Sequence, residues 1–86
     1  AVRQYPDGAP IRVRVQGDGR PQAFVWAGET HRIESIEAVR EPRLEWWSTE
    51  GEVHRRYYLV VTHRGLVCEI YRDLAADEWF VGRRLD

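Results

Sequence analysis

Hydrophobic and polar residues alternate along most of this chain, and alternation is the pattern of strands rather than helices. Side chains along a strand point to the two faces of a sheet in turn, so a period of two marks a strand with one buried face. Turn-forming residues separate the alternating segments at strand-like intervals. The clearest of these segments cover residues 11–15, 21–27, 53–62 and 66–72. The pattern therefore predicts an all-β protein.

The longest predicted strands, residues 53–62 and 66–72, form a hairpin, and its register depends on the loop. A three-residue loop that ends in a glycine bulge places Val60 opposite Cys68. A two-residue loop would instead place Val60 opposite Glu69. Because the first register collects the apolar side chains on one face and buries more carbon, we expect that register.

Other segments predict irregularities in the sheet. Ile33 and Ile36 are three residues apart, which no flat strand places on one face, so we expect a bulge near Glu34-Ser35. Residues 73–77 are polar and contain alanine, and they predict one short helical turn capped by an aspartate. A last strand is expected over residues 79–81, ended by the glycine that follows.

Together these elements predict a small, mainly antiparallel curled sheet or barrel, SH3-like or roll-like, with six or seven strands and at most one short helical turn. Residues 1–10 contain two prolines and a glycine, and we expect them to form an N-terminal arm. The remaining residues, 11–86, are expected to form a single small β domain around one core.

Charge and cysteine content restrict the surroundings of the protein. All 13 basic residues are arginine, and 14 acidic residues leave a net charge of −1, which disfavours binding driven by positive charge alone. A single cysteine excludes an internal disulfide and fits a reducing compartment. No apolar run is long enough for a membrane span or a signal peptide. We therefore expect a cytoplasmic protein with no membrane partner.

The sequence offers little for catalysis. The three histidines lack the spacing of metal ligands, so we expect no metal. Cys68 lies in an apolar stretch, and neither serine lies in a nucleophile motif. The glycines at 17 and 19 are not followed by the helix and lysine of a phosphate-binding loop. We predict no cofactor and no catalytic residues, and hence a protein that is not an enzyme.

Aromatic and arginine side chains are the candidate binding groups. Adjacent aromatic residues on a strand send one ring to each face, so the tryptophan pair on a predicted strand over residues 44–48 should expose one ring. Tryptophan, tyrosine and arginine are enriched at interface hot spots, and an open sheet edge can pair with a partner strand. The candidate binding residues are Arg12, Arg14, Trp47, Arg55, Arg56, Tyr57, Tyr71 and Arg72.

These residues favour a protein-interaction module, with a protein partner or a second copy of the chain as the occupant. The alternative is a single-stranded nucleic-acid-binding domain, because bases stack on aromatic rings and phosphates pair with guanidinium groups. Acidic residues through the middle of the chain oppose this alternative unless the sheet separates the charges by face.

The order of the aromatic residues resembles that of a small bacterial domain of unknown function. The shared pattern is Phe24-x-Trp26, Trp46-Trp47, Tyr57-Tyr58, Thr62-x-x-Gly65, Glu69-Ile70-Tyr71-Arg72-Asp73 and Trp79. That domain occurs alone and also resembles the C-terminal tail of ImuB-type proteins, the inactive relatives of Y-family translesion polymerases. The resemblance covers about residues 11–86 and implies an accessory role near DNA-damage tolerance, with no catalytic residues. Arg40 stands where the pattern would have an aromatic residue, which leaves room for a different partner.

Overall fold

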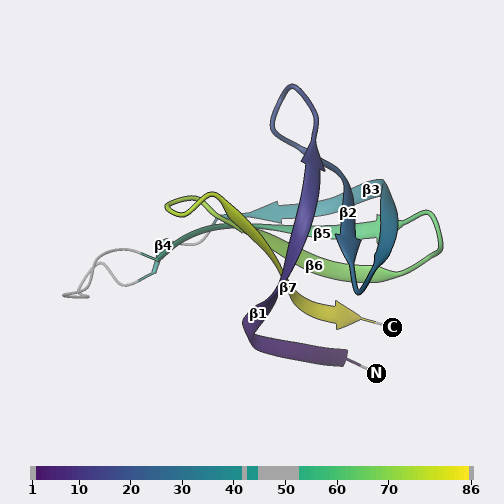
Figure 1. The fold of residues 1–86 in the computed structure, drawn as a ribbon. Helices are drawn as coiled ribbons and strands as arrows, with labels where there is room; N and C mark the ends of the chain where they lie inside the picture. Colours follow the sequence, from purple (N-terminus) through teal and green to yellow (C-terminus); the bar gives the residue numbers. More distant parts are fainter. Residues whose placement is uncertain (1, 42, 45–52, 86) are drawn as a thin grey trace.

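The computed structural model describes residues 2–41, 43–44 and 53–85, and within them the chain is all-β. Seven strands follow one another without a helix among the described residues (Figure 1). They are β1 (Val2–Val15), β2 (Pro21–Trp26), β3 (Glu29–Arg40), β4 (Arg43–Leu44), β5 (Val53–Thr62), β6 (Val67–Asp73) and β7 (Glu78–Leu85). The predicted fold class is confirmed.

Six of these strands close into an antiparallel barrel. Their order is β3-β2-β1-β7-β6-β5, and β3 pairs with β5 to complete the ring, while the short β4 extends it beside β5. Two strands are long and bent enough to serve two neighbours each. The first part of β3 pairs with β2 and its second part with β5, and β1 passes in the same way from β7 to β2.

The hairpin of β5 and β6 has the predicted register. Val60 lies opposite Cys68 and Tyr58 opposite Ile70, which places these side chains inside the barrel. The predicted bulge in β3 is also confirmed, because the register shifts between Ile33 and Ser35. The core that results consists of Phe24, Tyr58, Val60, Cys68, Ile70, Trp79 and Val81.

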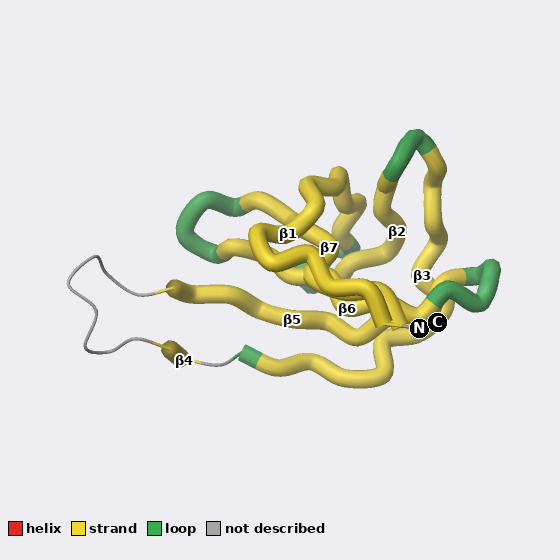
Figure 2. The backbone as a smooth tube through the Cα atoms, turned by 90° about the horizontal axis from the view of Figure 1, so that it is seen from below, coloured by secondary structure: helices red, strands yellow, loops and turns green. Residues whose placement is uncertain are grey.

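Both ends of the chain differ from the sequence prediction. Residues 2–10, expected as an arm, belong to β1, and the backbone pairs Val2 with Leu85 across the seam with β7. The two termini consequently lie side by side (Figure 2). The last strand also does not end at Gly82 but continues to Leu85. Glycine allows this because Gly82 is the extra residue of a bulge opposite β6.

The short turn predicted over residues 73–77 is present, and it does not extend into a helix. The Asp73 carboxylate accepts hydrogen bonds from the backbone N–H groups of Ala75 and Ala76, at 3.0 and 3.2 Å. The N–H of Asp77 donates to the carbonyl of Asp73 at 2.7 Å. None of the described residues forms a helix that is long and apolar enough to cross a membrane.

Candidate arginine-lined binding site

The outer face of the sheet formed by β1, β2 and β3 carries three arginines. Alternation turns Val13 and Phe24 toward the core, so their neighbours along each strand face outward. One outward row across the three strands is Arg14, Ala23 and Arg32, and the next is Arg12, Val25 and Thr30. We call these six residues the arginine face.

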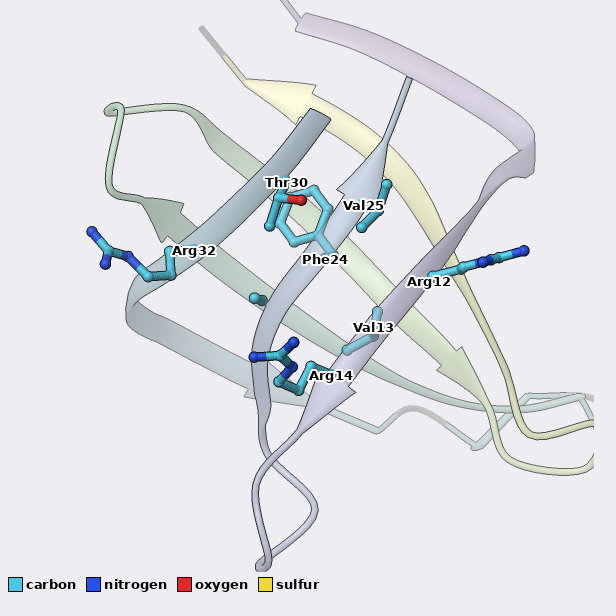
Figure 3. Close-up of a pocket in the computed structure, with 8 residues that line it drawn as sticks. Arg12, Val13, Arg14, Phe24, Val25, Thr30 and Arg32 are labelled. Carbon is cyan, nitrogen blue, oxygen red and sulfur yellow. The ribbon is translucent and has the colours of Figure 1, made fainter. Parts of the chain in front are cut away.

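The arginine face has a shallow hollow at its centre. The hollow encloses about 390 Å³ and has a floor of small or branched side chains from β2 and β3. The three guanidinium groups surround this floor rather than converge on one point (Figure 3). Arg12 points away from β2 and Arg14 lies beside β2, while Arg32 points away on the other side of β3 (Figure 3). This spread suits an extended anionic ligand better than a compact ion.

Arg12, Arg14 and Arg32 are exposed and form no ion pair with any described residue. Six other arginines with described side chains have carboxylate partners. These ion pairs are Arg20–Asp18, Arg40–Glu69, Arg83–Glu69, Arg56–Glu41, Arg64–Glu29 and Arg72–Asp77. The arginine face therefore combines three positive charges that the described part of the chain does not neutralise.

Arg55, Tyr57 and Tyr71 lie elsewhere, on the outer face of β5 and β6. The tyrosine rings are 5.1 Å apart between centroids, and the Arg55 guanidinium lies 4.7 Å from the centre of the Tyr71 ring. Phe80 stacks on Tyr71 with its centroid 5.2 Å away. Tyr71 is only 4% exposed, so its ring faces are covered by the protein itself. We call Arg55, Tyr57, Tyr71 and Phe80 the tyrosine stack.

A buried carboxylate stabilises the edge of the tyrosine stack. Glu69 is 5% exposed, and it accepts two hydrogen bonds from Arg40, at 3.1 and 3.2 Å, and one from Arg83, at 3.2 Å. The hydrogen bonds to Glu69 raise the pKa of Arg40, whose guanidinium also lies 4.2 Å from the Tyr57 ring centre. Such a charge-assisted network orders side chains rather than offering them to a ligand.

The remaining candidate residues do not join either group. Arg56 and Arg72 lie opposite each other on β5 and β6, and each is held by an acid of its own. Arg72 also lies 6.0 Å from the ring centre of Trp79. Trp47 and the strand predicted around it lie outside the described residues, apart from Leu44 in β4. Of the seven candidates that the structure describes, only Arg12 and Arg14 share an open face.

Sequence reasoning missed Arg32, although a signal for it was present. The turn at Ala27-Gly28 contains two residues of positive φ and leads Thr30 back opposite Val25 and Arg32 opposite Ala23. Reading that hairpin register from the turn would have placed Arg32 in the same outward row as Arg14. The sequence around Tyr71 favours pairing of Glu69 with an arginine on a solvated face. The structure shows that Glu69 does pair with arginine, with both Arg40 and Arg83, but the carboxylate is buried rather than solvated.

The site shows no arrangement for metal or nucleophile chemistry. Within residues 2–41, 43–44 and 53–85, no three histidine, cysteine or acidic side chains gather where they could hold a metal ion. Burial raises the pKa of the Cys68 thiol to about 12, so this sulfur stays protonated near neutral pH.

Fold and site together define a small, closed antiparallel β-barrel with an arginine-lined outer face. The family model for a domain of unknown function, DUF6504, matches residues 6–86. The chain belongs to this family. Neither a curated protein nor a solved structure matches the chain significantly.

Proposed function

We propose that this domain is a non-enzymatic protein-interaction module that binds an acidic segment of a partner protein on its arginine face. The observation that carries the proposal is the contrast between Arg12, Arg14 and Arg32, which form no ion pair with a described residue, and the ion-paired arginines elsewhere. Arginine is enriched at interface hot spots, and it binds carboxylates through two parallel hydrogen bonds. The apolar floor adds surface that a protein segment can cover.

A protein partner suits the arginine face better than single-stranded nucleic acid. Base stacking needs exposed ring faces, whereas the floor here consists of Ala23, Val25 and Thr30. Phe24 also lines the hollow but is only 1% exposed, because it packs in the core. The tyrosines expected to stack on bases belong to the tyrosine stack, where Arg40 and Arg55 lie over their rings.

The resemblance to the tails of ImuB-type proteins supports a more specific role. It favours a bacterial, cytoplasmic accessory protein that acts near DNA-damage tolerance by recruiting or positioning another protein. A closed barrel with one charged binding face suits such a role, because it needs only a rigid surface and no moving parts.

Binding to a defined acidic peptide tests the proposed function. The probe is a short, fluorescently labelled peptide in which glutamate alternates with valine, followed by fluorescence anisotropy. We expect saturable binding that the double substitution Arg12→Gln/Arg14→Gln weakens roughly tenfold or more, because each lost charge-assisted contact contributes about 1.5 to 3 kcal/mol. The matched control, Arg20→Gln/Arg64→Gln, changes the net charge equally and should leave the affinity within about twofold.

Two results would contradict the proposal. One is equal weakening by both double variants, which would mean that net charge alone attracts the peptide. The other is tighter binding of a labelled oligothymidine than of the peptide, with the same dependence on Arg12 and Arg14. That result would favour the nucleic-acid alternative.

A further inference from the structure

One edge of β1 is open where the strand leaves the barrel wall. The ladder between β1 and β7 ends at the pair Ile11 and Trp79, whereas β1 continues to Val15. From Arg12 onward β1 is paired with β2 on its other edge. Among the described residues, no strand pairs with the edge of residues 12–15 that faces away from β2.

The hydrogen-bond pattern of β2 shows which backbone groups of β1 face β2. Trp26 and Glu29 pair across a two-residue turn, and the residues that close such a turn are hydrogen-bonded to each other. Because bonding alternates along a strand, the N–H and C=O of Val25 and Ala23 point the other way, toward β1. Their register partners there are Arg12 and Arg14.

The backbone groups of Val13 and Val15 therefore point to the open edge. A second observation agrees: the N–H of Gln16 donates to the carbonyl of Arg20, beside β2, at 2.8 Å. Alternation from Gln16 again turns Arg14 toward β2 and Val13 and Val15 away from it. Within the described part of the chain, no partner for these four backbone groups is present.

A second hollow lies beside this edge, where β1 and β7 separate. It encloses about 520 Å³, and its lining includes Ile11 and Val13 from β1 and Glu78 and Trp79 from the start of β7. Ile11 and Val13 are partly buried and pack against the core. The edge thus has room beside it, an apolar side toward the core and a basic side at Arg12 and Arg14.

We propose that an extended segment of the partner protein, with alternating acidic and apolar residues, adds to this edge of β1 as an antiparallel strand. Its acidic residues lie opposite Arg12 and Arg14, and its apolar residues lie opposite Val13 and Val15. The segment continues the ladder that β7 leaves at Trp79, which sets the antiparallel direction. This inference rests on the proposed function and specifies how the partner binds: the added strand lies along β1 beside the hollow rather than over its floor, and of the arginine face it meets Arg12 and Arg14.

Charge also selects against two other occupants of the edge. A second copy of β1 paired edge to edge would place arginines opposite arginines, and like charges opposite each other destabilise a strand pair. A uniformly acidic segment would bring its charge to Glu78 and to the apolar side at Val13. Alternation therefore distinguishes the expected partner from a merely acidic one.

Backbone methylation of the glutamate–valine peptide tests strand addition without altering the protein. In an antiparallel pair, the peptide residue opposite Val13 directs its N–H toward β1, whereas the residue opposite Arg12 directs its N–H away. We expect N-methylation of the valine amides to weaken binding roughly tenfold or more. N-methylation of the glutamate amides is the matched control and should leave the affinity within about twofold, because those N–H groups face solvent.

Each outcome bears on a separate claim. Equal binding by both methylated peptides would overturn strand addition while the proposed function stands, and loss of binding by the glutamate-methylated peptide alone would overturn the antiparallel pairing. Failure of the unmethylated peptide to bind would overturn both proposals.

A sharper measure is amide hydrogen exchange in the protein. Val13 and Val15 should exchange fast when free and slowly with peptide, and slow exchange in the free protein would overturn the open edge.

Discussion

At the scale of single residues, the surroundings of arginine decide its role in this protein. Arg40 and Arg83 share the buried Glu69 and stabilise the barrel wall. The Arg55 side chain donates to the Tyr57 hydroxyl at 3.4 Å, which raises the pKa of Arg55, and its guanidinium covers a tyrosine ring. Arg12 lies in neither kind of environment. Because the residue type is the same in all these places, only the neighbours separate structural arginines from candidate ligands for a partner.

Gly8 is a residue that the fold cannot replace cheaply. Its φ is +74°, and a methyl group built on it would lie 2.9 Å from the Cβ of Phe80. The same methyl group would also clash with the Tyr71 hydroxyl oxygen. We expect Gly8→Ala to lower the free energy of unfolding by about 3 kcal/mol, the sum of a left-handed backbone and an overpacked contact. Urea denaturation followed by tryptophan fluorescence measures this change.

Gly19 provides the control, since its φ is +88° but nothing lies within 4 Å of the same built methyl group. Gly19→Ala should therefore lower the free energy of unfolding by only about 1 kcal/mol. Equal losses in the two variants would show that Gly8 does not pack on the tyrosine stack.

His31 makes stability depend on pH. Its ring is stacked on Phe24 with centroids 5.0 Å apart, it is 8% exposed, and its Nδ1 has no hydrogen-bond partner. Burial lowers the pKa of His31, and Glu29 only partly offsets this shift. The unfolded chain therefore binds a proton at higher pH than the folded one does. The free energy of unfolding should fall as the pH drops through about 6.5 toward the lower folded pKa.

The substitution His31→Phe should remove this dependence and leave the protein more stable by about 1 kcal/mol at pH 5.5, because it keeps the stacked ring and removes an unsatisfied buried nitrogen. Urea denaturation between about pH 7.5 and 5.5 measures this, a window above the range in which Glu41 titrates. The control His54→Gln, at an exposed ion pair with Glu41, should retain the fall in stability. An unchanged pH profile in His31→Phe would contradict the assignment.

At the scale of strands, sequence patterns predicted local features well. Apolar alternation was sufficient for the register of β5 and β6, because a slip of one residue would turn Val60 and Ile70 out of the core. The spacing of Ile33 and Ile36 predicted the bulge in β3 for the same reason. The alternation over residues 11–15 also places Arg12 and Arg14 on one face, and the register of β1 with β2 agrees.

Features that depend on distant parts of the chain were not predictable in this way. The two prolines and the glycine of residues 1–10 favoured an arm over a strand, yet pairing with the C-terminal residues of β7 includes residues 2–10 in β1. Gly82 looked like a terminator, and only β6 opposite it makes it a bulge. The Tyr71 ring is likewise shielded from solvent by Phe80, which belongs to another strand. A period of two says which side chains share a face, but not which strand lies next to them.

At the scale of the whole molecule, closure of the barrel depends on its two ends. The seam of β1 and β7 pairs Val2 with Leu85, and a second long-range ladder joins β3 to β5. Neither ladder forms until distant segments of the chain have met. The chain therefore loses conformational entropy in closing these loops before the contacts that compensate for the loss can form. The local hairpins of β2 with β3 and of β5 with β6 bury little by themselves.

We therefore expect slow, cooperative folding, with a main refolding phase in the range of about milliseconds to seconds, as in other small barrels dominated by non-local pairs. Stopped-flow tryptophan fluorescence measures this, since Trp79 packs on Tyr58 at 5.5 Å between centroids only when β5 and β7 are in place. Unfolding in urea should give coincident transitions by fluorescence and far-ultraviolet circular dichroism.

Gln4→Pro provides a sharp test, because it disturbs the seam at its pairing with Arg83 while leaving the local hairpins intact. It should slow refolding or abolish it, and folding at the unaltered rate with unaltered stability would show that closure at β1 and β7 is dispensable.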